Sequence, residues 1–156
     1  MYESIKLLHL IAAIVWIGGM ACLLFAVRPA ALGTLDAQPR ARLMVQIWRR
    51  FFAMVAVAVV LLLATGGQLY SSAFRAARAA GGAGGLPLGW NLMLAIGLLM
   101  FLIFGHIYFG AFKKFSRAVA AAEWPLAAKT AGLIHKLVVA NFVLGWLAII
   151  CVRLVH

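Results

Sequence analysis

Four long apolar segments, separated by stretches that hold most of the charged residues, dominate the sequence. They span about residues 5–27, 51–70, 91–112 and 133–154. A helix of about twenty residues, rising about 1.5 Å per residue, covers roughly 30 Å, which is the thickness of the hydrocarbon core of a bilayer. The pattern therefore predicts an all-α membrane protein with four transmembrane helices, in a single integral membrane domain of residues 1–156.

The segments between the spans give further expectations about where helices end. The first helix is expected to stop at Arg28-Pro29, because proline cannot continue a helix. Residues 28–50 then form a polar connection, whose second half is expected to lie at the membrane surface with Leu43, Ile47 and Trp48 on its apolar face. The glycine-rich stretch Ser71–Gly89 is predicted to be a flexible loop that can include one helical turn around Phe74–Ala79.

The end of the chain is predicted to form one continuous helix. Residues 113–123 have good helix propensity and extend the third helix beyond the lipid, and Trp124-Pro125 marks the break. Because proline suits the first turn of a helix, a last helix is expected to run from there through Leu154.

Composition supports a membrane protein and excludes several other classes. Hydrophobic residues make up 67% of the chain and charged residues only 11%, which leaves too little polar surface for a soluble domain of 156 residues. The net charge of +11 comes from residues that flank the apolar segments, so it does not indicate a nucleic-acid partner. The only acidic residues, Glu3, Asp36 and Glu123, lie outside these segments, which argues against hydrolytic chemistry.

The distribution of basic residues predicts how the chain is oriented. Ten of the fourteen lysines and arginines lie in the connections between spans one and two and between spans three and four: Arg28, Arg40, Arg42, Arg49, Arg50, Lys113, Lys114, Arg117, Lys129 and Lys136. The other four, Lys6, Arg75, Arg78 and Arg153, fall on the opposite side. By the positive-inside rule, both termini lie on the non-cytoplasmic side of an antiparallel four-helix bundle in the bacterial inner (plasma) membrane.

Two histidines are expected at similar depth in the cytoplasmic half. His106 precedes Lys113 by seven residues, which places it about 10 Å from the end of the third span, and His135 lies at the start of the fourth. Two imidazoles from different helices are the usual axial ligands of a b-type haem in a membrane protein. They predict one haem site, whose propionates Arg49, Arg50 and Lys136 would hold. The alternative is that each histidine only forms a hydrogen bond across the bundle.

His9 is expected at a separate, outer site. It lies nineteen residues before Arg28, so its height differs from that of His106 by about 18 Å. The ligand expected there is a second haem, a quinone headgroup or a copper ion. The nearest candidates by height are Met93, Cys151 and His156. The two cysteines, Cys22 and Cys151, form no C-x-x-C motif and indicate neither a disulfide framework nor a zinc site.

Several motifs resemble the CopD-like family of bacterial integral membrane proteins. They are LHLIAAIVWIGGM at residues 8–20, RRF at 49–51, TG at 65–66, FGHIYF at 104–109 and LVVANFVLG at 137–145. The pattern also resembles the haem-binding HemJ-type protoporphyrinogen oxidases. Both groups commonly begin the third span with His-x-Lys, whereas this chain has Asn91-Leu92-Met93, so oxidase activity is not carried over. The resemblance supports His9 and His106, whereas His135 rests on its depth alone.

Three functions are compatible with these observations. The first is a small membrane b-type cytochrome with one or two haems, which exchanges electrons with a quinone or a redox partner protein. Such a protein could also be an enzyme, a haem-dependent membrane oxidoreductase. The second is a copper-handling protein for resistance or uptake, which uses the outer His9 site. The third is a non-catalytic subunit or assembly factor, and the sequence also allows a homo-oligomer.

Overall fold

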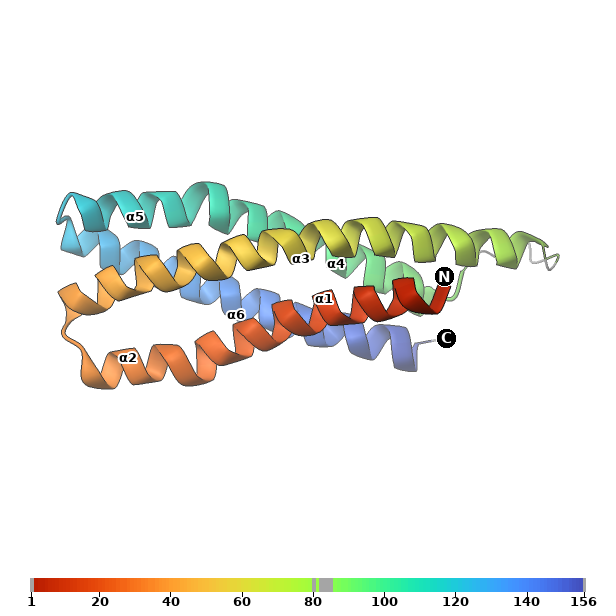
Figure 1. Cartoon of the computed structure of the whole chain (residues 1–156), viewed down its shortest axis with the longest axis horizontal. Coiled ribbons are helices and arrows are strands. Elements are labelled where there is room, and N and C mark those ends of the chain that lie inside the picture. The colour runs from red at the N-terminus through yellow and green to blue at the C-terminus, as the bar shows by residue number, and fades with distance from the viewer. Residues whose placement is uncertain (1, 80, 82–85, 156) are drawn as a thin grey trace.

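The computed structural model describes residues 2–79, 81 and 86–155, which form four long helical segments side by side along one axis (Figure 1). No β-strand occurs in these residues. The elements are α1 (Tyr2–Cys22), the π-helix η1 (Leu23–Val27), α2 (Arg28–Thr34), α3 (Ala37–Ala79), α4 (Leu88–His106), the π-helix η2 (Ile107–Ala111), α5 (Phe112–Ala120) and α6 (Trp124–Leu154). Each of the four segments is long and apolar enough to cross a membrane, as the sequence predicts.

The molecule has two distinct ends. Both termini, together with the connection from α3 to α4, lie at one end, which we call the terminal end (Figure 1). The turns from α2 to α3 and from α5 to α6 lie at the other end, which we call the basic end because it holds Arg28, Arg40 and Lys113. The chain therefore passes four times between the same two ends.

The first helix is longer than the sequence predicts. It does not stop at Arg28-Pro29 but continues as α2 to Thr34, where Leu35 adopts an extended backbone. Proline lies in the first turn of α2, directly after the π-helix η1. In η1 the N–H of Arg28 donates to the carbonyl oxygen of Leu23, five residues earlier, so the hydrogen-bond register has already changed where Pro29 lacks its N–H. The change of helix type therefore allows the chain to pass through Pro29.

The second segment also extends beyond its predicted limits. The stretch 71–79, which was expected to be loop, is the last part of the 43-residue helix α3. The expected surface lead-in is the first part of the same helix, where Met44, Val45 and Trp48 are buried and Leu43 is exposed. Packing against other helices buries Met44, Val45 and Trp48, whereas the position of Leu43 at a membrane surface stays a prediction.

The predictions for the last part of the chain are confirmed. Helix continues from α4 through η2 and α5 to Ala120, and α6 runs without a break from Trp124 to Leu154. In the turn between them, Ala122 has a left-handed backbone with φ 57°, and the N–H of Glu123 donates to the carbonyl oxygen of Ala118. This hydrogen bond closes the end of α5 before α6 begins.

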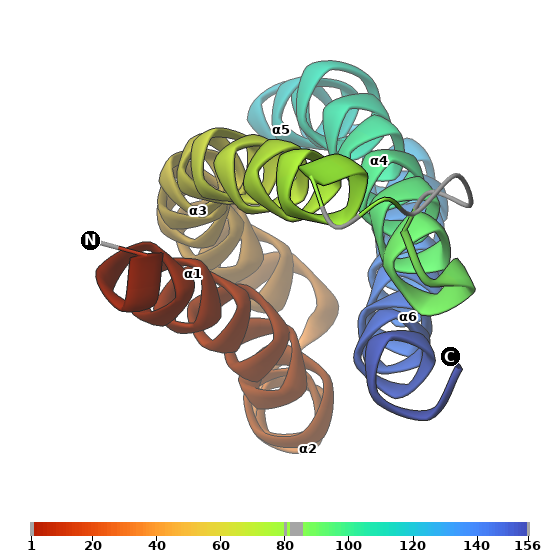
Figure 2. The same cartoon turned by 90° about the vertical axis from the view of Figure 1, so that its right-hand side faces the viewer.

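The helices associate as two pairs. α1 packs mainly along α3, and α4 packs mainly along α6, and the end view shows that α1 and α6 lie apart at the terminal end (Figure 2). Near mid-height, Trp16 of α1 stacks on Phe101 of α4, with ring centroids 5.7 Å apart and an interplanar angle of 7°. Gly145 of α6 faces Ile17 at the same level, because a methyl group at Gly145 would lie 3.1 Å from that side chain. These contacts join the two pairs in the middle of the molecule.

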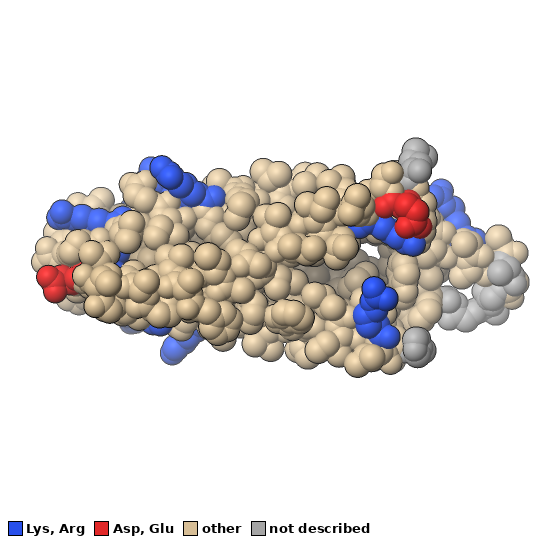
Figure 3. Space-filling model, turned by 60° about the horizontal axis from the view of Figure 1, so that its bottom comes forward, with Lys and Arg blue, Asp and Glu red and all other residues tan. Residues whose placement is uncertain are grey.

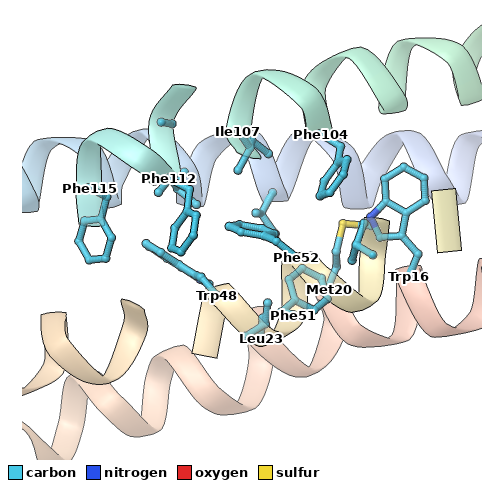
Figure 4. Close-up of a cluster of buried hydrophobic side chains, with 14 of the residues drawn as sticks. Trp16, Met20, Leu23, Trp48, Phe51, Phe52, Phe104, Ile107, Phe112 and Phe115 are labelled. Atoms are coloured by element: carbon cyan, nitrogen blue, oxygen red, sulfur yellow. The ribbon is translucent and has the colours of Figure 1, made fainter. Parts of the chain in front are cut away.

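Toward the basic end, an aromatic cluster fills the space between the pairs (Figure 4). Phe52 is 1% exposed and lies 5.2 Å from Phe112 and 6.1 Å from Phe104, measured between ring centroids. Trp48 lies 4.9 Å from Phe115. The rings meet edge to face, which is a favourable arrangement for aromatic side chains. This half of the bundle is therefore densely packed.

Candidate ligand site at the terminal end

His9 of α1 is held by a short chain of hydrogen bonds to α3. Its Nδ1 lies 2.8 Å from the hydroxyl oxygen of Thr65, and that hydroxyl donates to the carbonyl oxygen of Leu61 at 2.5 Å. Thr65 is buried, with 6% of its surface exposed. The bond between His9 and Thr65 therefore ties the first two membrane helices together at a fixed point.

This chain determines which ring nitrogen of His9 is free. A hydroxyl group has a single hydrogen, and that of Thr65 is used in the bond to Leu61. With that hydrogen on the Leu61 carbonyl, the Thr65 oxygen accepts a hydrogen from Nδ1, and this tautomer leaves Nε2 of the neutral ring with an unprotonated lone pair. Histidines that ligate metals usually donate their other N–H in this way, and the partner fixes the orientation of the ring.

Local packing further restricts the imidazole. His9 lies three and seven residues before Ala12 and Trp16, so it continues the buried face of α1. A methyl group at Gly66 would lie 3.1 Å from Cε1 of His9, so the ring rests almost directly on the backbone of α3. A side chain at residue 66 would push the ring away. The pair Thr65-Gly66 therefore combines a hydrogen-bond acceptor with the space that the ring needs.

Met93 and Gly97 of α4 occupy a similar height across the bundle. The stack of Trp16 on Phe101 fixes the relative heights of α1 and α4, which run in the same direction (Figure 1). His9 precedes Trp16 by seven residues and Met93 precedes Phe101 by eight, which correspond to about 10 Å and about 12 Å of helix rise. Met93 is half-buried, and no atom lies within 4 Å of the position that a Gly97 side chain would take.

A hollow opens between α1 and α6 at this end of the molecule. The space-filling view shows it on the face where these two helices separate, close to both termini (Figure 3). In the described part of α6, no residue beyond Gly145 is fully buried. His9 and the open space beside Gly97 belong to the same half of the bundle. The terminal half therefore combines a free histidine nitrogen, a thioether and unfilled volume.

A second set of hydrogen bonds lies farther toward the terminal end. The hydroxyl of Tyr70 in α3 donates to Oδ1 of Asn91 in α4 at 2.7 Å, and Nδ2 of Asn91 donates to the carbonyl oxygen of Leu86 at 3.3 Å. Asn91 therefore connects the two helix ends across the 80–87 connection.

One buried polar group lacks a partner in the described part of the chain. Asn141 of α6 is 2% exposed, and its Nδ2 donates to the carbonyl oxygen of Met100 in α4 at 3.2 Å. Its Oδ1 accepts no hydrogen bond from any described residue. An unpaired buried oxygen is costly in a membrane interior, so this atom is a natural acceptor for a bound water or ligand. Asn141 lies at about the height of Trp16, which marks the boundary between the basic half and the terminal half of the bundle.

The structure places His106 and His135 in different surroundings. His106 is exposed, and a methyl group at Gly110 of the same helix would lie 3.9 Å from its Nδ1. His135 is half-buried on α6, close enough to Arg28 of α2 for the two charges to interact. No hydrogen bond among the described residues joins the two histidines. The structure does not supply a shared partner for them.

His9 and His106 are well separated in height. His106 follows Phe101 by five residues and His9 precedes Trp16 by seven, so twelve residues, or about 18 Å of helix rise, separate them along the bundle. This estimate from the aromatic stack agrees with the depth difference expected from the sequence. The two histidines therefore belong to different halves of the molecule.

The remaining predicted ligands show no direct role in the terminal site. Arg49, Arg50 and Lys136 are exposed. Cys151 is half-buried, and its backbone carbonyl faces Gly89 of α4. His156 lies outside the described residues. In residues 2–79, 81 and 86–155, no three histidine, cysteine or acidic side chains form a group that could hold a metal ion.

The sequence did not single out Thr65, Asn141 or the pair Tyr70 and Asn91 as parts of a site. A signal was available for Thr65, since a threonine followed by glycine is unusual in an apolar helix, but its partner lies 56 residues away. Comparison with models of protein families, with curated proteins and with solved structures finds no match for this chain. The resemblance to the CopD-like and HemJ-type families therefore stays a prediction.

Proposed function

We propose that the protein is a small membrane b-type cytochrome that holds haem between its helices at the terminal end and passes single electrons to or from a membrane partner such as a quinone. The observation that carries this proposal is the bonded chain from His9 through Thr65 to Leu61. It orients one imidazole and leaves its Nε2 free, as an axial ligand requires.

The surroundings of His9 fit a flat, apolar cofactor. The face is hollowed between α1 and α6 (Figure 3). Gly66 leaves room for the His9 ring, and the position of a side chain at Gly97 is open. Met93 supplies a thioether at the height of His9, and histidine with methionine is a known axial pair for haem in electron carriers. Haem supplies the redox chemistry when bound, and the protein provides the ligands, the apolar surroundings and the distance to partners.

The proposal is tested by the visible spectrum of protein purified in a mild detergent after expression with a haem precursor. We expect a Soret band and sharp α and β bands after reduction, and a His9→Ala variant should lose the bands of the terminal site. His106→Ala is the matched control, because it removes the same group from an exposed position about 18 Å away. A His9→Ala protein with an unchanged spectrum and unchanged haem content would contradict the proposal.

Copper handling is the second candidate, and the soft sulfur of Met93 at the height of His9 favours it. The same preparation distinguishes the two functions. A colourless protein that binds one copper ion, and loses it on His9→Ala substitution, would support copper handling. A protein with neither haem nor copper would support the role of a non-catalytic subunit or assembly factor.

A second haem between His106 and His135 stays a prediction. Its support is the similar distance of both residues from the basic end, whereas the exposure of His106 and the different neighbours of His135 give it no further support. Alanine at either position should remove a low-spin signal that remains in His9→Ala. If both single variants keep a six-coordinate spectrum in that background, the pair holds no haem.

The proposed setting is the bacterial inner membrane, which the chain would cross four times in an antiparallel arrangement with both termini outside the cytoplasm. Its support is that ten of the fourteen basic residues lie in the half of the bundle toward the basic end. Reporter fusions at the C-terminus test this orientation. An active C-terminal alkaline phosphatase would agree with this orientation. An inactive phosphatase fusion, together with fluorescence from a C-terminal green fluorescent protein, would contradict it.

A further inference from the structure

A separate cavity lies at the basic end, far from His9. It has a volume of about 250 Å³ and lies between α2, the start of α3 and the start of α6. Phe115 of α5 also contributes to its lining. The cavity therefore borders the aromatic cluster and is separate from the terminal ligand site.

Two half-buried arginines line the cavity without a counterion. Arg28 comes from α2 and Arg40 from α3, and neither forms an ion pair with a described carboxylate. The only ion pair in the described part of the chain joins Lys6 and Glu3. Arg40 donates one N–H to the carbonyl oxygen of Leu35 at 3.1 Å. Since a guanidinium group has five N–H donors, both side chains retain donors for an anion in the cavity.

The rest of the lining is apolar and small. Small side chains from three helices line most of the cavity: Ala31, Ala37, Ala41, Ala127, Ala128, Ala131 and Gly132. Trp48 and Trp124 form aromatic surfaces, and Arg42 lies over the ring of Trp124 with its guanidinium carbon 5.8 Å from the centroid. The cavity therefore offers cationic donors beside an apolar surface, which suits an amphiphile with an anionic head.

We propose that this cavity binds the phosphate headgroup of an anionic phospholipid. Guanidinium groups pair well with phosphate oxygens, and basic pockets between membrane helices are suited to anionic lipid headgroups. Arg28 directly follows the first apolar span, so the cavity lies at the depth where headgroups begin. The small residues and Leu32 give an acyl chain a surface to lie against. A soluble phosphate would use the two arginines but not this apolar wall.

The test measures lipid binding by the full-length protein in a mild detergent, using native mass spectrometry and thermal unfolding. The probes are dioctanoyl phosphatidylglycerol, dioctanoyl phosphatidylcholine and inorganic phosphate. We expect phosphatidylglycerol to bind at least about tenfold more tightly than phosphatidylcholine and to raise the melting temperature. Arg28→Gln and Arg40→Gln should each weaken that binding about tenfold, because each removes charge-assisted hydrogen bonds.

Two further variants separate lipid binding from effects on folding or total charge. Arg75→Gln is the charge-matched control, because it removes one exposed arginine from α3 near the terminal end and should bind the lipid as the native protein does. Gly132→Leu keeps both arginines but fills the cavity, and no atom lies within 4 Å of the position of its new Cβ. It should fold normally and lose the lipid.

Three results would overturn the proposal. Equal binding of the two lipids would show that the anionic headgroup is not recognised. Undiminished phosphatidylglycerol binding by Arg28→Gln, Arg40→Gln and Gly132→Leu would place the lipid elsewhere. Inorganic phosphate that binds as tightly as the lipid and displaces it would identify a soluble phosphate as the ligand.

Discussion

The two halves of the bundle differ in what fills the space between the helix pairs. In the basic half, aromatic rings from α3, α4 and α5 occupy it, and Phe52 contacts four other rings besides Phe51 (Figure 4). In the terminal half, α1 has only one fully buried residue beyond Trp16, which is Ala12. The four helices are thus densely packed in the basic half, whereas α1 and α6 separate in the terminal half (Figure 2).

This difference shows how a small membrane protein can combine stability with space for a ligand. Helices in lipid gain little from burying apolar groups and depend on close packing and hydrogen bonds between them. The aromatic cluster supplies that packing in the basic half. The terminal half is then free to hold polar groups such as His9 and Thr65 beside unfilled volume. The cavity lined by Arg28 and Arg40 borders the cluster, because Trp48 and Phe115 belong to both.

The largest expected effect on this contrast comes from Phe52→Ala. Removing a ring that is 1% exposed leaves a cavity in the cluster, and such changes cost about 3–5 kcal/mol of stability in well-packed proteins. Thermal and denaturant unfolding in detergent measure the loss. Phe109→Ala removes the same ring from a position that is 67% exposed and should cost less than about 1 kcal/mol. Equal losses for the two variants would show that the cluster does not stabilise the bundle.

A second pair of variants compares two glycines of α4. A side chain at Gly89 would collide with the carbonyl oxygens of Cys151 and Val155, so Gly89→Leu should separate α4 from α6 and cost about 3 kcal/mol. Gly97→Leu enters open space and should leave the melting temperature nearly unchanged, while it reduces cofactor content. Cofactor content measured with stability distinguishes these outcomes. A Gly97→Leu protein with full cofactor content would place the ligand elsewhere.

The hydrogen bond behind His9 gives a third prediction. Thr65→Val keeps the shape of the side chain but removes the acceptor for Nδ1, and loss of such a partner typically weakens metal binding 10–100-fold. Titration of the cofactor into protein prepared without it measures the change. Thr130→Val is the matched control, since Thr130 is also buried and also donates within its own helix, to Leu126 at 2.8 Å. If both variants bind equally, the bond to Thr65 does not support the ligand.

The smallest effect is expected for Asn141→Leu at the boundary of the halves. The change removes one bond to the carbonyl of Met100, and hydrogen bonds between membrane helices average about 0.6 kcal/mol. It also removes the unpaired Oδ1, so stability should change by less than about 1 kcal/mol. A loss of more than about 2 kcal/mol in unfolding experiments would show that Oδ1 has a partner in the membrane.

The number and order of the membrane helices followed from the sequence, because continuous apolar segments of this length usually form transmembrane helices. The start of α6 at Trp124 was equally predictable, since Pro125 fits only the first turn. The helix ends at Thr34 and Ala79 were not. A π-helix lets the helix continue past the proline signal at Pro29, whereas residues 71–79 hold no glycine and extend α3 up to the glycine-rich run.

The sequence by itself determined which residues could hold a cofactor, since only four histidines and six methionines are present. It also determined their approximate heights, because helix rise is constant. Tertiary structure decided which of them face usable space. His9 has its partner 56 residues away, and the exposure of His106 depends on how α4 is rotated against its neighbours. Rotation and pairing of apolar helices are set by the fit of side chains between them, and that fit cannot be read along one chain.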